Sequence, residues 1–376
     1  MIMERNISIY VHIPFCVKKC RYCDFPSFAG ANNIDSYFSA LISEIKKEQD
    51  TRGRTADTVY IGGGTPSCVP PLLIEAVIDE LRKTYVINKN TEISMEMNPG
   101  TYAKAQPAVY RRAGINRISL GCQSFNEKSL KRLGRIHSAE DIIKTYDILR
   151  NEGFENINLD LISSLPGEGI RDTERSLRKA IALQPEHISV YSLIIEEGTE
   201  FHRLLAAGKM KDLPDEEEQA ETDLLVRSIL REEKYKRYEI SNYAREGREC
   251  RHNICYWKRR EYRGFGLAAA SLVGKRRFTN TREMVYINDP GGILSEDRIL
   301  NREEEMAEFM FLGLRQTEGI SASDFSLSFG TAIEEVYGEQ LEDQMKKGFM
   351  EHTGERYCYN DWGLEVSNIL LSEFLL

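Results

Sequence analysis

The sequence lacks any apolar run long enough to cross a membrane. A transmembrane helix needs about 18 to 20 consecutive apolar residues, and in this chain of 376 residues polar or charged residues interrupt every apolar stretch sooner. The first residues, "MIMERNISIYVHIPFC", also lack the basic-then-apolar layout of a signal peptide. We therefore expect a cytoplasmic protein without a membrane span, a location that leaves peripheral membrane contact open.

The sequence has no excess of positive charge. Its formal net charge is −9 at pH 7, whereas nucleic-acid-binding proteins usually present a basic face. Two short basic clusters, at 258–260 and 275–277, are expected to be solvated surface. We therefore expect no nucleic-acid partner. The length allows two or three domains with a substantial core.

Cysteine pairs of the CxxC type are also missing after the first 25 residues. Cys16, Cys20 and Cys23 form a CxxxCxxC group, "CVKKCRYC", with no second pair to complete a structural zinc site. His12 is a nearby candidate for a fourth zinc ligand, but it falls inside a predicted strand. Three thiolates on a four-iron cluster leave one iron open to an exogenous molecule. The spacing thus favours an iron–sulfur cluster over zinc. The other five cysteines are expected to be small buried hydrophobes: Cys68, Cys122, Cys250, Cys255 and Cys358.

Short β-branched runs alternate with amphipathic stretches over the first two-thirds of the chain. Helices are predicted at 34–48 and 71–84, and the second should place Leu72, Ile74, Val77 and Leu81 on one face. Because a parallel crossover needs a returning helix, this alternation predicts an α/β fold with parallel strands. Six strands predict an incomplete (β/α)6 parallel barrel, open on one side. The predicted strands are 7–13, 58–62, 92–97, 117–122, 157–162 and 187–193.

The pattern changes after about residue 205. A charged helix is predicted at 214–235, and a second helical region begins near 300. Strand-like pieces follow at 355–360 and 363–367. We expect a smaller C-terminal helical, winged-helix-like domain. The predicted domains are a barrel at 1–205, a connecting, porphyrin-associated region at 206–295 and the C-terminal domain at 296–376.

Unusual polar residues follow the predicted strands of the barrel. The cysteine group follows the first strand, and the glycine turn 62–67, "GGGTPS", follows the second. Glu96 and Gln123 close the third and fourth strands, and Asp160 lies within the fifth. Parallel barrels gather their chemistry at the carboxyl ends of their strands, so these groups should meet at one mouth. The glycines should expose backbone amides and carbonyls to a bound molecule.

The motifs together resemble the radical S-adenosylmethionine (SAM) enzymes related to oxygen-independent coproporphyrinogen III oxidase. "HIPFCxxxCxYC", "GGGTPS", "EMNPGT", "ISLGCQSF" and "LGRIH" carry the resemblance, which covers essentially the whole chain. It implies that Cys16, Cys20 and Cys23 ligate a [4Fe–4S] cluster whose open iron binds the amino and carboxylate groups of SAM. The residues implied to line the SAM pocket are Tyr10, Tyr22, Gly63, Gly64, Thr65, Glu96, Gln123, Arg135 and Asp160.

Within that pocket, the chemistry of the implied residues suits SAM. Glu96 and Asp160 are anions that match an ammonium group or ribose hydroxyls, and Arg135 can bind a carboxylate with two parallel hydrogen bonds. The alternative for Arg135 is a surface ion pair without function.

Two departures distinguish this chain from the oxidases. Those enzymes carry a fourth cysteine two residues after the third, where this chain has Phe25, and they carry a longer N-terminal arm. Both departures resemble the heme chaperone branch of the family, as does "RHNICYW", which matches an HNxxYW motif beginning at His252. The resemblance implies a protein that binds heme and delivers it to an acceptor protein, such as a respiratory enzyme.

His252 is the candidate heme-binding residue, because imidazole is a common heme ligand. The alternative is that His252 only bonds to neighbouring groups. Cys250 and Cys255 flank it, so a small zinc site is a further alternative. One departure concerns heme directly: Ala270 stands where the branch usually shows a histidine in a "GAHS"-like turn.

Two other functions compete with heme delivery. The chain could oxidatively decarboxylate coproporphyrinogen III, or it could be a radical SAM methyltransferase that opens heme. The sequence does not decide whether the protein is an enzyme.

Overall fold

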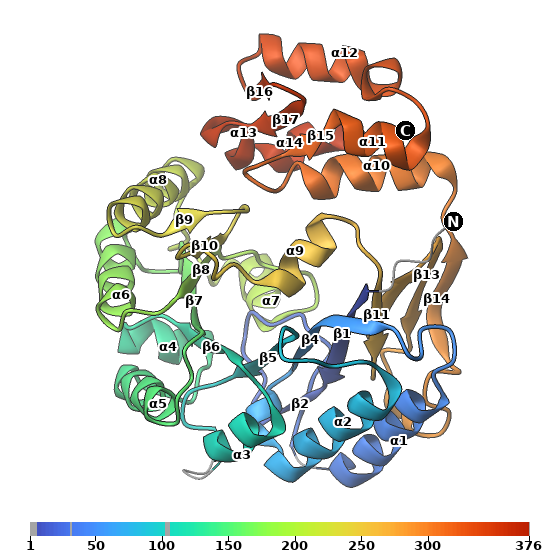
Figure 1. The fold of residues 1–376 in the computed structure, drawn as a ribbon. Helices are drawn as coiled ribbons and strands as arrows, with labels where there is room; N and C mark the ends of the chain where they lie inside the picture. Colours follow the sequence, from blue (N-terminus) through green and yellow to red (C-terminus); the bar gives the residue numbers. More distant parts are fainter. Residues whose placement is uncertain (1–5, 31, 102–105, 376) are drawn as a thin grey trace.

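The computed structural model describes residues 6–30, 32–101 and 106–375, and its centre is one large sheet (Figure 1). Along the sheet the strand order is β14-β13-β12-β11-β1-β4-β5-β6-β7-β8-β10-β9. The six strands from β1 to β8 in this order pair in parallel, as predicted. They are β1 (Asn6–Ile13), β4 (Thr55–Gly63), β5 (Glu92–Met97), β6 (Arg117–Gln123), β7 (Ile157–Ser163) and β8 (His187–Ser192).

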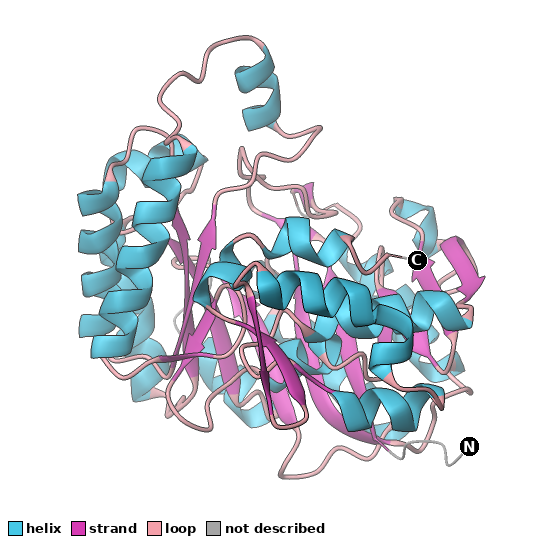
Figure 2. Ribbon diagram, turned by 90° about the horizontal axis from the view of Figure 1, so that it is seen from above, coloured by secondary structure: helices cyan, strands magenta, loops and turns pink. Residues whose placement is uncertain are grey.

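Helices return the chain between these parallel strands and lie outside the sheet (Figures 1 and 2). Ile74, Val77 and Leu81 of α2 are buried as predicted, but Leu72 is 64% exposed. The prediction for Leu72 was wrong because two residues span about 200° of a helix, which turns Leu72 away from Ile74. The returning helices are α1 (Ile34–Lys47), α2 (Pro71–Thr84), α3 (Gln106–Ala113), α4 (Glu127–Leu133), α5 (Ala139–Asn151) and α6 (Ile170–Ala182).

Additional strands extend both edges of the parallel sheet without closing it. On one edge β11 (Tyr262–Phe265) pairs in parallel with β1, followed by antiparallel β12 (Ala270–Val273), β13 (Arg276–Asn280) and β14 (Leu294–Ile299). On the other edge, antiparallel β10 (Asn242–Ala244) and β9 (Lys236–Arg237) follow β8. Among the described residues no pairing joins β14 to β9, so the predicted incomplete barrel is confirmed.

Short helices and strands lie around the barrel and connect it to the C-terminal part. The predicted charged helix is α8 (Glu216–Glu232), and Asp215 caps its first turn by accepting a hydrogen bond from the Glu218 amide. The other short elements are β2 (Phe15–Cys16), β3 (Phe28–Ala29), η1 (Pro66–Cys68), α7 (Glu200–Ala206), α9 (Arg251–Trp257) and η2 (Met284–Ile287). In the described part of the chain no helix has the length and apolarity that crossing a membrane requires.

The C-terminal residues form a helical unit with a small sheet and a core of their own (Figure 1). This confirms the predicted helical domain with a β-wing. The prediction of a strand at 363–367 was wrong: Asn360 accepts a hydrogen bond from the Gly363 amide and starts helix α13 there. The elements are α10 (Arg302–Gly313), β15 (Ile320–Ser321), α11 (Ala322–Phe329), α12 (Ile333–Lys346), β16 (Met350–Thr353), β17 (Arg356–Tyr359), α13 (Asp361–Glu365) and α14 (Ser367–Ser372).

Candidate functional site

The three clustered cysteines lie on the loop that follows β1. Cys16 is 9% exposed, and Cys20 and Cys23 are half-buried. The Cys23 amide donates to the Cys20 carbonyl at 3.3 Å, which folds the loop back on itself. Burial raises the pKa of Cys16 and of Cys23, and the neighbouring thiols raise both further. Crowded thiols of this kind are suited to a cationic group that stabilises their thiolates.

Among the described residues, no three His, Cys, Asp or Glu side chains converge as ligands of a single metal ion would. A four-iron cluster takes one thiolate per iron, so its ligands do not have to meet at one point. His12, the alternative fourth zinc ligand, is 3% exposed, and its Nε2 bonds the Pro26 carbonyl at 2.8 Å. The donor set therefore fits a cluster better than one zinc ion.

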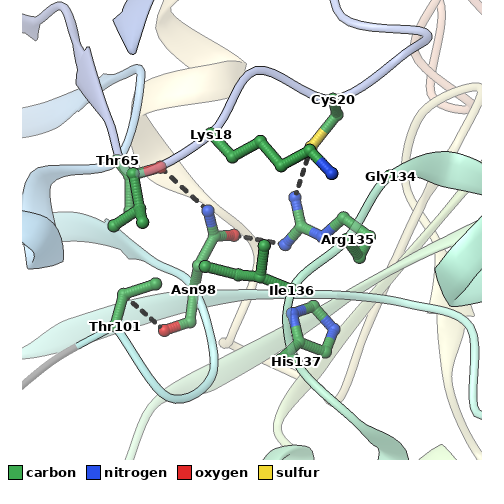
Figure 3. A pocket seen from close by; sticks show the side chains of 10 residues that line it. Lys18, Cys20, Thr65, Asn98, Thr101, Gly134, Arg135, Ile136 and His137 are labelled. Atoms are coloured by element: carbon green, nitrogen blue, oxygen red, sulfur yellow. Dashed lines mark hydrogen bonds between the residues drawn. The ribbon is translucent and has the colours of Figure 1, made fainter. Parts of the chain in front are cut away.

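A chain of hydrogen bonds connects two of the thiols through polar side chains, and Figure 3 shows the part of it that runs from Cys20 to Thr65. Arg135 donates from Nη1 to Cys20 Sγ at 3.5 Å and from Nη2 to the Asn98 side-chain oxygen. Asn98 donates to Thr65 Oγ1 at 2.9 Å, and Thr65 donates to Cys16 Sγ at 3.5 Å. We call these five residues the thiol belt. Hydrogen bonds to the sulfurs fix their positions and are one of the means by which proteins tune iron–sulfur clusters.

A cavity lies beside this belt (Figure 3). Its volume of about 280 Å3 includes space that is open to solvent. Arg135 lies in its wall and also donates to the Gly121 carbonyl at 2.6 Å, so the alternative of a surface ion pair is wrong. The lining residues are Val17, Lys18, Cys20, Thr65, Asn98, Thr101, Gly134, Arg135, Ile136 and His137.

The glycine turn after β4 holds the cysteine loop instead of offering free amides. The Gly64 amide donates to the Ile13 carbonyl at 2.8 Å, and the Gly63 amide donates to Glu96 at 3.0 Å. A Cβ atom on Gly64 would lie 2.6 Å from the Phe15 carbonyl oxygen. The prediction that these amides are exposed was therefore wrong. Gly64 is needed because the turn packs directly against this backbone, and Gly63 is needed because a Cβ there would meet the His12 ring.

Two carboxylates lie inside the barrel near this turn. Glu96 accepts hydrogen bonds from the Tyr60 hydroxyl and the Gly63 amide, each at 3.0 Å. Asp160 accepts from Ser119 and Asn158, each at 2.8 Å. Burial, with the charge of Asp160, raises the pKa of Glu96 to about 7, and burial raises the pKa of Asp160. Such paired, desolvated carboxylates favour binding of a cation.

Gln123 has a strained backbone at the end of β6. Its φ of 67° is left-handed, and the β6–β7 register shifts between Gly121 and Gln123. A Cβ atom on Gly121 would lie 3.0 Å from Gln123 Nε2 and 2.6 Å from the Asn98 side-chain oxygen. The Gln123 side chain therefore lies near Asn98 of the thiol belt, and strain of this kind is concentrated at binding sites.

Tyr10 and Tyr22 lie on different sides of the site. The Tyr10 hydroxyl bonds His12 Nδ1 at 3.0 Å, and its ring stacks with Tyr60 at 6.3 Å inside the barrel. Tyr22 packs against apolar residues near α4, including Leu133. Neither tyrosine is among the residues that line the cavity.

The structure places His252 away from this mouth. Its Nδ1 bonds the Thr58 hydroxyl at 2.7 Å and its Nε2 bonds the Tyr256 hydroxyl at 2.9 Å, while the side chain is 1% exposed. Thr58 lies in β4 five residues before Gly63, toward the amino end of the strand. Burial, with the charge of Arg117, lowers the pKa of His252 to about 3. This geometry speaks against His252 as a heme ligand and supports the alternative of internal hydrogen bonding.

The zinc alternative at the flanking cysteines has no better support. Cys250 is fully buried and its Sγ lies 3.9 Å from Glu92, while the Cys255 thiol faces the Glu261 carbonyl at 3.8 Å. The described residues provide no third ligand that converges with these two thiols.

Sequence reasoning missed Asn98, the central member of the thiol belt. The available signal was its place in "EMNPG", directly after β5, at the same edge of the sheet as Glu96. Lys18, Thr101 and His137 of the cavity wall were also missed, because they lie on loops whose positions the strand pattern does not predict.

The chain is similar to known proteins in both sequence and fold. A family model described as the radical SAM superfamily matches residues 10–180, and one for the HemN C-terminal domain matches residues 300–366. "Heme chaperone HemW" of Bacillus subtilis (strain 168) is 33% identical over 98% of this chain and 99% of that protein. The Escherichia coli (strain K12) protein of the same name is also 33% identical, over 100% of both chains.

A solved structure, E. coli coproporphyrinogen III oxidase (HemN), described as a radical SAM enzyme, shares the fold. It superposes with a TM-score of 0.85 over 99% of this chain and 90% of that chain, at 23% identity.

Proposed function

Because the chain belongs to the radical SAM superfamily and, within it, to the family of the HemW heme chaperones, we propose that it binds heme and delivers it to an acceptor protein. The superfamily implies a [4Fe–4S] cluster and SAM as cofactors. The relatives' name supplies the heme chemistry of the proposal.

The proposed cluster ligands are Cys16, Cys20 and Cys23. Once bound, the cluster would supply an electron for reductive cleavage of SAM. The thiol belt supports this assignment, because Thr65 and Arg135 donate hydrogen bonds to two of the sulfurs from opposite ends of one polar chain. Donors aimed at a sulfur stabilise its thiolate, which is the form that binds iron.

The proposed SAM pocket uses charges of both signs. Arg135 and Asn98 are suited to the carboxylate of SAM, and Glu96 and Asp160 are suited to accept from its amino N–H groups and ribose hydroxyls. Gln123 would orient the bound molecule from the strained end of β6. The remaining proposed residues support the pocket by packing: Tyr10, Tyr22, Gly63, Gly64 and Thr65.

The observation that carries the proposal is the thiol belt, in which Thr65 and the cation Arg135 donate hydrogen bonds to two of the three cysteine sulfurs. A fourth cysteine is absent where the oxidases have one: that position is Phe25, which is 65% exposed. This absence favours heme delivery over oxidative decarboxylation. The oxidase remains the second candidate, because the HemN fold is shared over nearly the whole chain.

One experiment separates the two functions. The anaerobically reconstituted protein is incubated with SAM, a reductant and either heme or coproporphyrinogen III, and the tetrapyrrole is then analysed by mass spectrometry. We expect unmodified heme bound to the protein and no vinyl product from coproporphyrinogen III. A decarboxylated porphyrinogen would establish the oxidase, and a methylated linear tetrapyrrole would establish a heme-opening methyltransferase.

A further inference from the structure

Cations and carboxylates meet in pairs where the C-terminal unit packs against the barrel. We call this contact the seam; it is formed by residues 257–260 after α9 and by α10 with residues 314–318 (Figure 1). Lys258 Nζ lies 3.0 Å from Glu318, and Arg259 Nε lies 2.9 Å from Glu308. Such pairing is expected, because an uncompensated charge is costly to remove from water.

Arg315 departs from this pattern. In the described part of the chain, its half-buried guanidinium has neither a hydrogen-bond acceptor nor an ion-pair partner, and its Nε is closed to solvent. The guanidinium carbon lies 5.4 Å from the centre of the Trp257 ring. Burial lowers the pKa of Arg315, and the charge of Glu239 opposes the change. An arginine stays protonated in proteins, so the buried Nε–H of Arg315 is a donor that lacks an acceptor among the described residues.

Two more donors without acceptors lie on neighbouring segments. Trp257 Nε1 and Arg237 Nη1 are buried and have no hydrogen-bond partner in the described residues. The other Arg237 nitrogens donate to the Ile240 carbonyl, at 2.7 and 3.1 Å. Arg237 Nε also donates to the Glu239 carbonyl at 3.2 Å, and Glu239 forms a bridge with Gln316, the residue after Arg315. Glu239 itself accepts from the Ser241 amide at 3.2 Å.

Buried donors in proteins are normally paired, so three unpaired donors on neighbouring segments offer a place for an acceptor. We propose that Arg315, with Trp257 and Arg237, binds the propionate carboxylates of the tetrapyrrole. This inference rests on the proposed function, because it assumes that heme is the molecule carried. A carboxylate fits because the planar fork of a guanidinium pairs with it through two parallel hydrogen bonds. Stacking on Trp257 holds the face of the guanidinium and leaves its edge for the ligand.

The assignment gives the HNxxYW motif two separate roles. His252, near the start of α9, turns into the barrel and bonds Thr58. Trp257, at the end of the same helix, meets Arg315 of the C-terminal unit. The motif can therefore contribute to heme binding without its histidine serving as an iron ligand.

The test compares heme with heme dimethyl ester, which keeps the macrocycle and iron but has no free carboxylates. Both are titrated by absorbance against the full-length reconstituted protein. We expect the wild type to bind heme at least about tenfold more tightly than the ester, the size of one charge-assisted hydrogen bond. Arg315→Met should remove most of that preference by weakening heme and leaving the ester unchanged. Lys258→Met, which removes a cation already paired across the seam, should keep the preference.

The outcomes separate the two proposals. If Arg315→Met keeps the full preference for heme, the propionate site is wrong while heme binding stands. If the wild type binds neither compound, both the site and the proposed function fail. If Arg315→Met does not fold, Arg315→Lys and Trp257→Phe provide the test, because each removes part of the donor set. An unchanged preference in both of these variants would also overturn the site.

Discussion

At the scale of single residues, the raised pKa of Glu96 leads to a testable pH dependence. Burial and the charge of Asp160 raise its pKa from 4.5 to about 7, so between these values the folded protein binds a proton that the unfolded chain has released. The stabilising contribution of Glu96 is therefore complete below pH 4.5 and is lost as pH rises through about 7. A positively charged ligand beside Glu96 should reverse this effect by favouring the carboxylate.

Glu96→Gln should remove this pH dependence. We expect the free energy of unfolding of the wild type to fall, relative to that of the variant, by up to about 3 kcal/mol between pH 4.5 and 8. In the reconstituted protein, SAM affinity of the wild type should rise over pH 6 to 8, and that of the variant should not. Denaturant titrations and SAM binding measured across this range check both. Glu140→Gln, at an exposed helix position, is the control and should follow the wild type.

His252 gives a second prediction at this scale. His252→Ala should lower the free energy of unfolding by about 2 to 4 kcal/mol, because it leaves the buried hydroxyls of Thr58 and Tyr256 without their partner. Heme affinity should stay near that of the wild type. Thr58→Val, which removes one of the two bonds, should have a smaller effect on stability. A variant of normal stability that no longer binds heme would show that His252 is a ligand after all.

At the scale of elements, the glycine turn and the cysteine loop act as one piece. Gly64→Ala would place a methyl group 2.6 Å from the Phe15 carbonyl oxygen, so the cysteine loop must move. We expect a loss of about 1 to 3 kcal/mol in stability and less iron retained after anaerobic reconstitution. Gly169→Ala is the matched control, since a Cβ there meets no atom within 4 Å. Full iron content in Gly64→Ala would contradict the role given to this turn.

The sequence was sufficient to predict the six parallel strands and the edge of the sheet at which their polar residues meet. Strands read from β-branched runs, and the polar residues after them, had to meet because parallel strands end at one edge. Two features of the site were not predictable in this way. Asn98 joins the thiol belt through a loop, and Gln123 has a left-handed backbone at a register shift. The periodicity of a strand contains neither feature.

The sequence also does not show which way the His252 side chain points. Its motif sits on a helix of seven residues, too short for its pattern to show which face enters the barrel. Packing against β4, which comes nearly 200 positions earlier, decides that the histidine is internal. A short motif can indicate a family without indicating the contact that each of its residues makes.

At the scale of the whole molecule, the seam joins the barrel and the C-terminal unit through ion pairs. Arg259 contacts Glu305 and Glu308, and all three side chains are at most 14% exposed. Arg259→Met should cost about 2 to 4 kcal/mol of stability, less than a fully isolated buried pair, because Lys275 and Arg277 still neutralise the two glutamates. Lys346→Met, in an exposed pair with Glu342, should change stability by less than about 1 kcal/mol. Equal effects in urea titrations of the two variants would show that the seam contributes no special stability.

The account as a whole depends on three thiolates holding a cluster whose remaining iron accepts SAM. The most direct measurement is electron paramagnetic resonance of the reduced, anaerobically reconstituted protein, with iron analysis, before and after addition of SAM. The account predicts about four iron atoms per chain and a spectrum that changes when SAM is added, and it predicts that Cys20→Ala loses both. Protein that retains no iron, or a cluster spectrum that SAM leaves unchanged, would contradict it.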